Sequence, residues 1–162
     1  MTEDFIIPLD GSASPRSFRW HAGKEFFDGF GNSDVLDADV DVVASVRGAE
    51  VDCSLEGTLT VPCDRCLEPV RLEVSYSAEL LVSHDENADG KGREVIFVPL
   101  EDKTLDLSQT VYDYSILSLP LQRVHPDGEC NPKVLEYLSS NSAGDSPFAS
   151  LGGLLDGEDN EK

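Results

Sequence analysis

The fold is decided by residues 37–82, which read DADVDVVASVRGAEVDCSLEGTLTVPCDRCLEPVRLEVSYSAELLV. Over residues 37–46, apolar residues alternate with Asp and Ser, the period-two pattern of a strand with one buried face. A second apolar face runs from Val51 to Val61. After a turn at Cys63–Cys66, a third and longer apolar strand face runs from Val70 to Val82. Three consecutive strands with short connections predict an antiparallel meander.

The segments that flank the meander predict shorter elements. Phe5–Leu9 and Arg16–Trp20 have the composition of edge strands, the first because it contains a proline. Residues 24–31 favour a short helical turn ended by glycine. Beyond the polar loop at residues 84–92, we expect one further strand over Glu94–Pro99.

The hydrophobic period then changes from two to that of a helix. The residues at helical spacing are Leu107, Val111, Tyr114 and Leu117. Asp106, with Gln109 three residues on, predicts a capping box, and Pro120 ends the helix. Pro132 is expected to start a second short helix that runs through Leu138.

Strands followed by helices predict an α+β fold. We expect an antiparallel sheet, either an open meander or a partly closed barrel, with two or three short helices in the C-terminal third. Residues 1–138 are predicted to form one domain. Residues 139–162 are predicted to form a linker, a short apolar segment and an acidic tail. The apolar residues of that segment are Phe148, Leu151, Leu154 and Leu155. The segment is too short to be stable alone, so we expect it to dock on this protein or on a partner.

The charge of the chain is strongly negative. It has 12 basic and 32 acidic residues, a formal net charge of −20, with the excess spread along its length. This distribution argues against direct nucleic-acid binding, which depends on clustered Lys and Arg. A basic protein partner is favoured by electrostatic steering. The alternative is that the charge serves solubility, or a salt-rich habitat.

The sequence also predicts a cytoplasmic location. No run approaches the roughly 20 apolar residues of a membrane span, so no membrane association is expected. The start, Met1-Thr2-Glu3-Asp4, is acidic where a secretory signal would be basic. In a cytosolic protein the four cysteines would stay reduced.

Three of those cysteines form a candidate metal site. A Cys-x-x-Cys turn such as Cys63–Cys66 supplies one edge of a tetrahedral zinc site. Cys130 and His125, from a turn-rich loop, would complete a Cys3His set, with Asp127 as another candidate for the fourth ligand. The alternative is that the thiols only pack around a turn.

Thiol redox catalysis is disfavoured. The charges of Asp64 and Glu68 are expected to raise a thiol pKa, and no βαβ pattern surrounds the turn. Cys53 lies on an apolar strand face and is expected in the core.

No pattern of a catalytic centre is found in the sequence. The glycines are scattered, so no phosphate-binding loop is predicted. His21 and His84 have no nucleophile near them in sequence, and Asp37, Asp39 and Asp41 line a strand face that is expected to be solvated. We therefore expect a protein without enzymatic activity. An RNA-modifying or thiol-dependent enzyme, the rival, would need a pocket with convergent polar groups.

Three motifs resemble a known family in order and spacing. They are Val61-Pro62-Cys63-Asp64-Arg65-Cys66-Leu67-Glu68-Pro69-Val70, residues 105–131 with Leu117-Ser118-Leu119-Pro120-Leu121 and His125-Pro126-Asp127-Gly128-Glu129-Cys130, and Asp145-Ser146-Pro147-Phe148-Ala149-Ser150-Leu151. The chain resembles the YceD family of large ribosomal RNA accumulation proteins over roughly residues 35–155. The resemblance implies a role in accumulation of large-subunit ribosomal RNA, and it maps the family's cysteines to Cys63, Cys66 and Cys130. It implies no catalytic residue and does not settle metal binding.

Charge and resemblance together predict a non-enzymatic factor in ribosome biogenesis. Its expected partner is a basic ribosomal protein or a preribosomal particle, contacted through protein. The alternative is a zinc-stabilised structural or interaction module with a non-ribosomal client.

Overall fold

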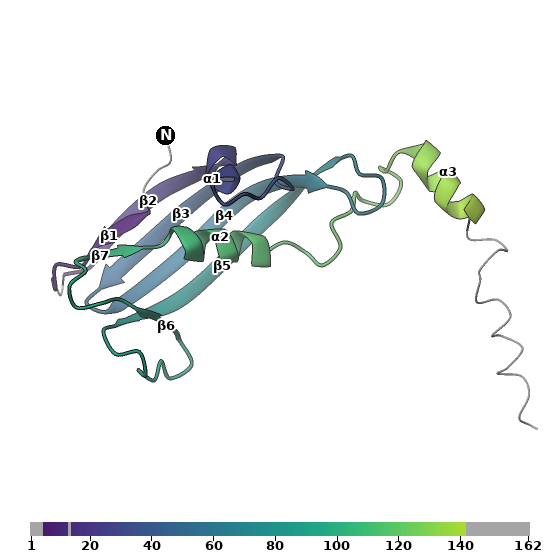
Figure 1. Ribbon diagram of the computed structural model, residues 1–162. Helices are drawn as coiled ribbons and strands as arrows, with labels where there is room; N and C mark the ends of the chain where they lie inside the picture. Colours follow the sequence, from purple (N-terminus) through teal and green to yellow (C-terminus); the bar gives the residue numbers. More distant parts are fainter. Residues whose placement is uncertain (1–4, 13, 142–162) are drawn as a thin grey trace, which may run out of the picture.

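The computed structural model describes residues 5–12 and 14–141 (Figure 1). Its elements in chain order are β1 (Ile6–Pro8), β2 (Arg16–Gly23), α1 (Lys24–Gly29), β3 (Asp37–Arg47), β4 (Glu50–Pro62), β5 (Pro69–Ser83), β6 (Glu94–Phe97), β7 (Thr104–Asp106), α2 (Ser108–Leu117) and α3 (Pro132–Asn141). The α+β class and the strands predicted for residues 37–82 are confirmed.

The main sheet has five strands in the order β2-β3-β4-β5-β6. Strands β2 to β5 are antiparallel in sequential order, so the predicted meander is confirmed. Val42 pairs with Leu55, and Leu55 pairs with Tyr76, which aligns the apolar residues of the three long strands on one face. A shift by one residue would turn every apolar side chain to solvent, so the alternation fixes this register.

Two expectations about the sheet are wrong. The alternative of a partly closed barrel is wrong, because within residues 5–12 and 14–141 strand β2 pairs only with β3 and β6 only with β5. The sheet is also not wholly antiparallel, since β6 lies parallel to β5, with Val82 opposite Ile96. Strand β1 does not extend the main sheet either. It pairs antiparallel with β7, a strand that the sequence pattern did not predict. The polar loop before β6 carries the chain back, which makes parallel pairing possible.

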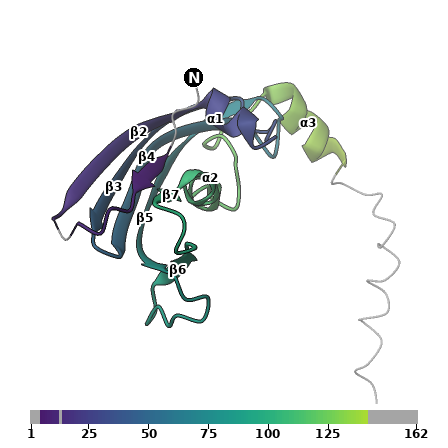
Figure 2. The same ribbon diagram turned by 60° about the vertical axis from the view of Figure 1, so that its left-hand side comes forward.

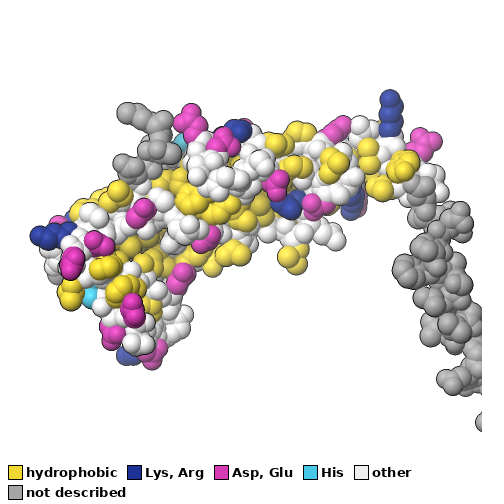
Figure 3. All heavy atoms as spheres, in the orientation of Figure 1, with side chains coloured by type: hydrophobic (Ala, Val, Ile, Leu, Met, Phe, Trp, Pro, Cys, Tyr) yellow, Lys and Arg dark blue, Asp and Glu magenta, His cyan; other side chains and the backbone are white. Residues whose placement is uncertain are grey.

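The core lies in the hollow of the curved sheet, where α2, β1 and β7 cover the inner face (Figure 2). Phe27, Val42 and Leu55 are almost fully buried there. Phe5 of the N-terminal segment packs on Trp20 and Phe26, with ring centroids 5.5 and 4.8 Å apart. Hydrophobic side chains gather along the middle of this side of the molecule (Figure 3). With the hollow filled by these elements, the sheet does not need closure to bury its apolar face.

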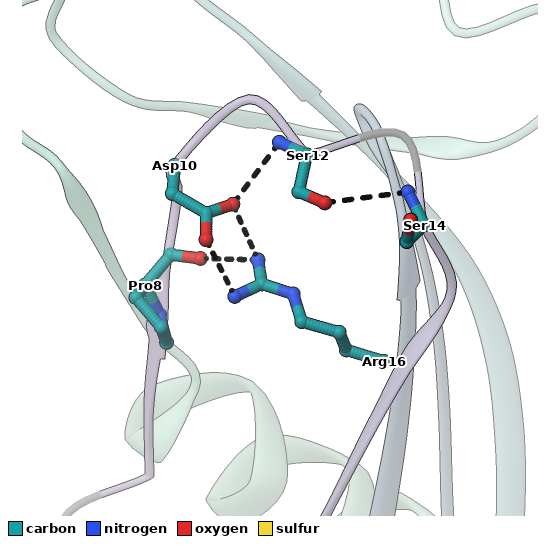
Figure 4. Close-up of polar contacts among 5 residues, drawn as sticks. All are labelled: Pro8, Asp10, Ser12, Ser14 and Arg16. Carbon is teal, nitrogen blue, oxygen red and sulfur yellow. Dashed lines mark hydrogen bonds and ion pairs between the residues drawn. The ribbon is translucent and has the colours of Figure 1, made fainter.

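An arginine fastens β1 to the start of β2. Arg16 donates to the Asp10 carboxylate and to the Pro8 carbonyl, both at 2.9 Å (Figure 4). The same carboxylate accepts the Ser12 backbone N–H at 3.0 Å. The connection between the two strands is thereby held against the sheet edge.

Helix α2 begins without the predicted capping box. Asp106 accepts the Ser108 N–H at 2.8 Å, while the Gln109 amide donates to Asp113 at 2.9 Å instead of reaching back. Tyr114 points into the core, as predicted, and its hydroxyl donates to the Glu94 carboxylate. Burial, and then this bond, raise the pKa of Tyr114. The pair joins α2 to the short edge strand β6.

Replacing Tyr114 by Phe is expected to lower the free energy of unfolding by about 1.5–3 kcal/mol, because it removes a hydrogen bond to a charged group. The measurement is the urea midpoint of the variant against the unaltered protein. Tyr137→Phe, at an exposed position on α3, serves as the control and is expected to change little. Equal midpoints for Tyr114→Phe and the unaltered protein would contradict the assignment.

The C-terminal elements agree in part with the prediction. Helices α2 and α3 lie in the C-terminal third, and α3 extends to Asn141, three residues past the predicted end. The predicted apolar segment Phe148–Leu155 and the acidic tail lie outside the described residues. Among the described helices, none has the length and hydrophobicity to span a bilayer.

Candidate metal centre

The turn from β4 to β5 forms a knuckle around the sulfur of Cys63. Pro62 and Pro69 form the last strand pair, and the backbone then folds back with Cys63 N–H donating to Glu68 O at 2.9 Å. Leu67 N–H donates to Cys63 O at 2.9 Å, and Leu67 itself has a φ of 62°. This left-handed residue lets the chain reverse within the turn. As a result the Arg65 N–H points at Cys63 Sγ, at 3.5 Å.

The loop after α2 is fastened to this knuckle by backbone and side-chain bonds. Asp64 N–H donates to Arg123 O at 2.7 Å, and Arg123 N–H donates to the Asp64 carboxylate at 2.8 Å. Further along, the Asn131 amide donates to Glu68 at 2.8 Å. These contacts bring two segments that are about sixty residues apart in sequence to the same place.

All four predicted ligands lie together. The donor atoms of Cys63, Cys66, His125 and Cys130 are within 4.8 Å of one another. Cys63 Sγ is 3.8 Å from Cys130 Sγ, and Cys66 Sγ is 3.5 Å from His125 Nδ1. Tetrahedral zinc, with Zn–S of about 2.3 Å and Zn–N of about 2.0–2.1 Å, requires S···S of about 3.8 Å and S···N of about 3.5 Å. These two separations therefore match the edges of a zinc tetrahedron.

His125 is oriented by its second ring nitrogen. Nε2 lies 3.0 Å from the Pro69 carbonyl oxygen, which can only accept, so Nε2 carries the proton and donates. In the neutral ring this leaves the lone pair on Nδ1, which faces Cys66 and Cys130. Such an outer hydrogen bond is the usual means by which proteins fix the tautomer of a metal-binding histidine.

The electrostatics of the cluster favour one thiolate. Burial opposes ionisation of Cys63, but the N–H groups of Cys66 and Arg65, with help from His125, outweigh it and lower the Cys63 pKa to about 6. The hydrogen bond with Cys63 raises the pKa of His125. The pKa of Cys130 is raised, first by burial and then by its sulfur neighbours.

The expectation that Asp64 and Glu68 raise the thiol pKa is wrong for Cys63. Their carboxylates accept hydrogen bonds from the Arg123 N–H and the Asn131 amide, and neither is among the causes that shift the pKa of Cys63. What faces the sulfur is the backbone N–H of the knuckle, which stabilises negative charge.

The cluster has a small apolar core of its own. Val61, Val70 and the three cysteines are buried together, and α3 joins them only through its first turns, with Val134 and Leu135. This core is distinct from the main core in the hollow of the sheet. Such a shell limits access of water to the donors.

The remaining candidates lie elsewhere. Asp127 is exposed and forms an ion pair with Arg65 at 3.6 Å, outside the group of donors. Cys53 is in the main core, as predicted, where burial raises its pKa to about 11. His84 Nδ1 lies 2.6 Å from the Val98 carbonyl, and His21 contacts Asp41 on the outside of the sheet. The Pro69 carbonyl could not be found from the sequence, because any residue type supplies a backbone oxygen.

Comparison with known proteins identifies one family. The model of the large ribosomal RNA subunit accumulation protein YceD matches residues 51–155, more than half of the chain. The matched region contains all four ligands of the candidate centre. No curated protein and no solved structure matches the chain.

Proposed function

Because the chain belongs to the YceD family of large ribosomal RNA subunit accumulation proteins, we propose that it is a non-enzymatic cytoplasmic factor that supports ribosomal RNA accumulation through contacts with basic ribosomal proteins. A structural zinc ion at the candidate metal centre stabilises it. The observation that supports the zinc assignment is the convergence of three sulfurs and one oriented imidazole within 4.8 Å of one another, with the Cys63–Cys130 and Cys66–His125 separations equal to edges of a zinc tetrahedron.

The donor set supports a structural rather than a catalytic ion. Catalytic zinc sites use three protein ligands and keep one position open for water or substrate. Here Cys63, Cys66, Cys130 and His125 supply four donors, and a small apolar core surrounds the cysteines. When bound, zinc would join the β4–β5 knuckle to the loop that leads into α3. Softer thiolate ligands also favour zinc over magnesium or calcium.

The charge supports contact through protein. At −20, the chain would be repelled by the phosphate backbone of ribosomal RNA. Ribosomal proteins that carry clustered Lys and Arg have the opposite sign. Attraction between the two would raise the rate of encounter and would weaken as salt rises.

The proposed function is tested by affinity purification of the tagged full chain from cells at low salt, with nuclease treatment and quantitative mass spectrometry. We expect large-subunit ribosomal proteins to be enriched over a tagged control protein of similar charge and size. Retention of a non-ribosomal client instead would favour the alternative of an interaction module. Absence of large-subunit proteins from the eluate contradicts the proposal.

A further inference from the structure

The outer face of the main sheet is left uncovered by the described chain. Helix α2, β1 and β7 all lie on the inner side of the arc of strands (Figure 2). The side chains that point outward from β3, β4 and β5 are exposed in alternation with the buried ones. We use "outer face" for this exposed side of strands β2 to β5.

The outer face is dominated by carboxylates. They include Asp39, Asp41, Asp52, Glu56, Glu73 and Glu79, all exposed. The arginines on the same side are Arg19, Arg47 and Arg71, and Arg71 is held by a bond to Thr58 at 3.1 Å. Solvated surfaces usually carry both signs of charge interspersed. The excess of one sign therefore calls for a physical explanation beyond solubility.

Like charges stand directly opposite each other on neighbouring strands of this face. Asp41 is the partner of Glu56 across β3 and β4, and Asp52 is the partner of Glu79 across β4 and β5. Directly opposed like charges destabilise a sheet. His21 lies 3.2 Å from Asp41 and relieves the first pair when protonated.

The repulsion within the second pair, Asp52 and Glu79, is relieved less. Arg93 acts on this pair, but its guanidinium is bonded to Glu50 at 2.6 Å. The pKa of Arg93 is raised chiefly by that bond, with smaller contributions from Glu79 and Asp52. Arg93 thus acts on three carboxylates, and its hydrogen bond is with Glu50 rather than with Asp52 or Glu79.

A shallow hollow lies at this second pair. Its volume is about 390 Å³, and Asp52, Glu79, Ser45, Ser54 and Ser77 line it. The short serine side chains leave space between the two carboxylates, and every polar side chain named here can accept a hydrogen bond. A lysine or arginine side chain would find several acceptors and two carboxylates in this hollow.

We propose that the outer face of the sheet is the docking surface for a Lys/Arg-rich segment of a protein partner, one of whose basic side chains enters the hollow between Asp52 and Glu79. The assignment rests on the proposed function, because it locates the contact with a basic ribosomal protein. Repulsion that costs the free protein stability is relieved when the cationic segment binds. Natural proteins commonly accept such a loss of stability at binding sites.

The test uses the full chain with Asp52→Asn and Glu79→Gln together, and salt-stripped proteins of the purified large ribosomal subunit as the probe, free of RNA. Removing the two interfacial charges is expected to weaken binding roughly tenfold or more at about 0.1 M salt. The same variant is expected to melt about 1–4 °C higher, because the opposed charges are gone. A merely structural role would not give weaker binding together with higher stability.

The matched control carries Glu86→Gln and Glu101→Gln, the same change of charge at exposed positions outside the sheet. It is expected to bind within about twofold of the unaltered protein. Equal loss of binding in both variants, or none in either, overturns the docking surface while leaving the proposed function in place. Failure of the unaltered protein to bind any large-subunit protein overturns the proposed function and this assignment with it.

Discussion

Cys63→Ser is expected to remove bound zinc from the purified protein and to release the loop after α2 together with α3. The pKa of Cys63 is lowered to about 6 by the N–H groups that face its sulfur, and that sulfur lies 3.8 Å from Cys130 Sγ. Mutation of a residue that only hydrogen-bonds to a metal ligand typically lowers metal affinity roughly 10–100-fold. We expect loss of a ligand itself to lower the affinity further. Zinc content is measured by elemental mass spectrometry, and loosening of α3 by amide hydrogen exchange.

We expect α3 to loosen because few contacts other than the metal centre hold it. Among the described side chains of this helix, Val134 and Leu135 are the ones that pack on the small core around the cysteines, while Tyr137 is 66 % exposed. Without the ion, the polar contacts of Asp64 and Glu68 are left to hold the loop. Elements with few buried apolar contacts open most readily.

The fourth cysteine provides the matched control. Cys53→Ala removes a buried sulfur from the main core and is expected to lower the melting temperature without loss of zinc. His125→Cys is expected to retain zinc in a four-cysteine site. Zinc content unchanged in Cys63→Ser, or lost equally in Cys53→Ala, would contradict the assigned ligands.

Gly57→Ala is expected to be the most damaging small substitution in the sheet. A Cβ at this position would lie 2.1 Å from the Asp39 carbonyl oxygen and 2.6 Å from Val40 Cα, both backbone atoms of β3. Because backbone cannot rotate away, the two strands would have to separate in the centre of the meander. Overpacking of this kind costs about 3 kcal/mol or more.

The measurement is the free energy of unfolding from urea denaturation. Gly29→Ala is the matched control, since a Cβ there meets no atom within 4 Å and the residue lies in α1. It is expected to be neutral or slightly stabilising, because alanine favours helix over glycine. A Gly57→Ala protein as stable as the Gly29→Ala protein would show that β3 and β4 are not this close.

The central strands could be predicted from sequence because their signal is local. Alternation over residues 37–46 and the turn at Cys63–Cys66 specify strand, face and connection without knowledge of the remaining chain. The edges could not be predicted in this way. Whether β6 runs parallel to β5, and whether β1 pairs with β7, depends on contacts between distant segments that leave no periodic trace in such short strands. The prediction of a capping box was wrong because the Gln109 side chain donates to Asp113 instead of reaching back to the start of the helix.

The donor residues of the candidate site could be predicted from the sequence, but the backbone groups that orient and stabilise them could not. Cysteine and histidine spacing identified Cys63, Cys66, Cys130 and His125, since few residue types bind zinc. The Pro69 carbonyl and the knuckle N–H groups are backbone atoms, so no residue type marks them. The effect of Asp64 on the thiol was misjudged because neighbours in sequence need not be neighbours of the sulfur. In the fold, Asp64 turns to Arg123.

The central structural claim is a closed four-ligand zinc centre, and zinc K-edge X-ray absorption on the purified full chain tests it most directly. We expect three Zn–S distances of about 2.3 Å and one Zn–N distance of about 2.0–2.1 Å, with no bound water. A first shell containing a water oxygen or fewer than three sulfurs would contradict it.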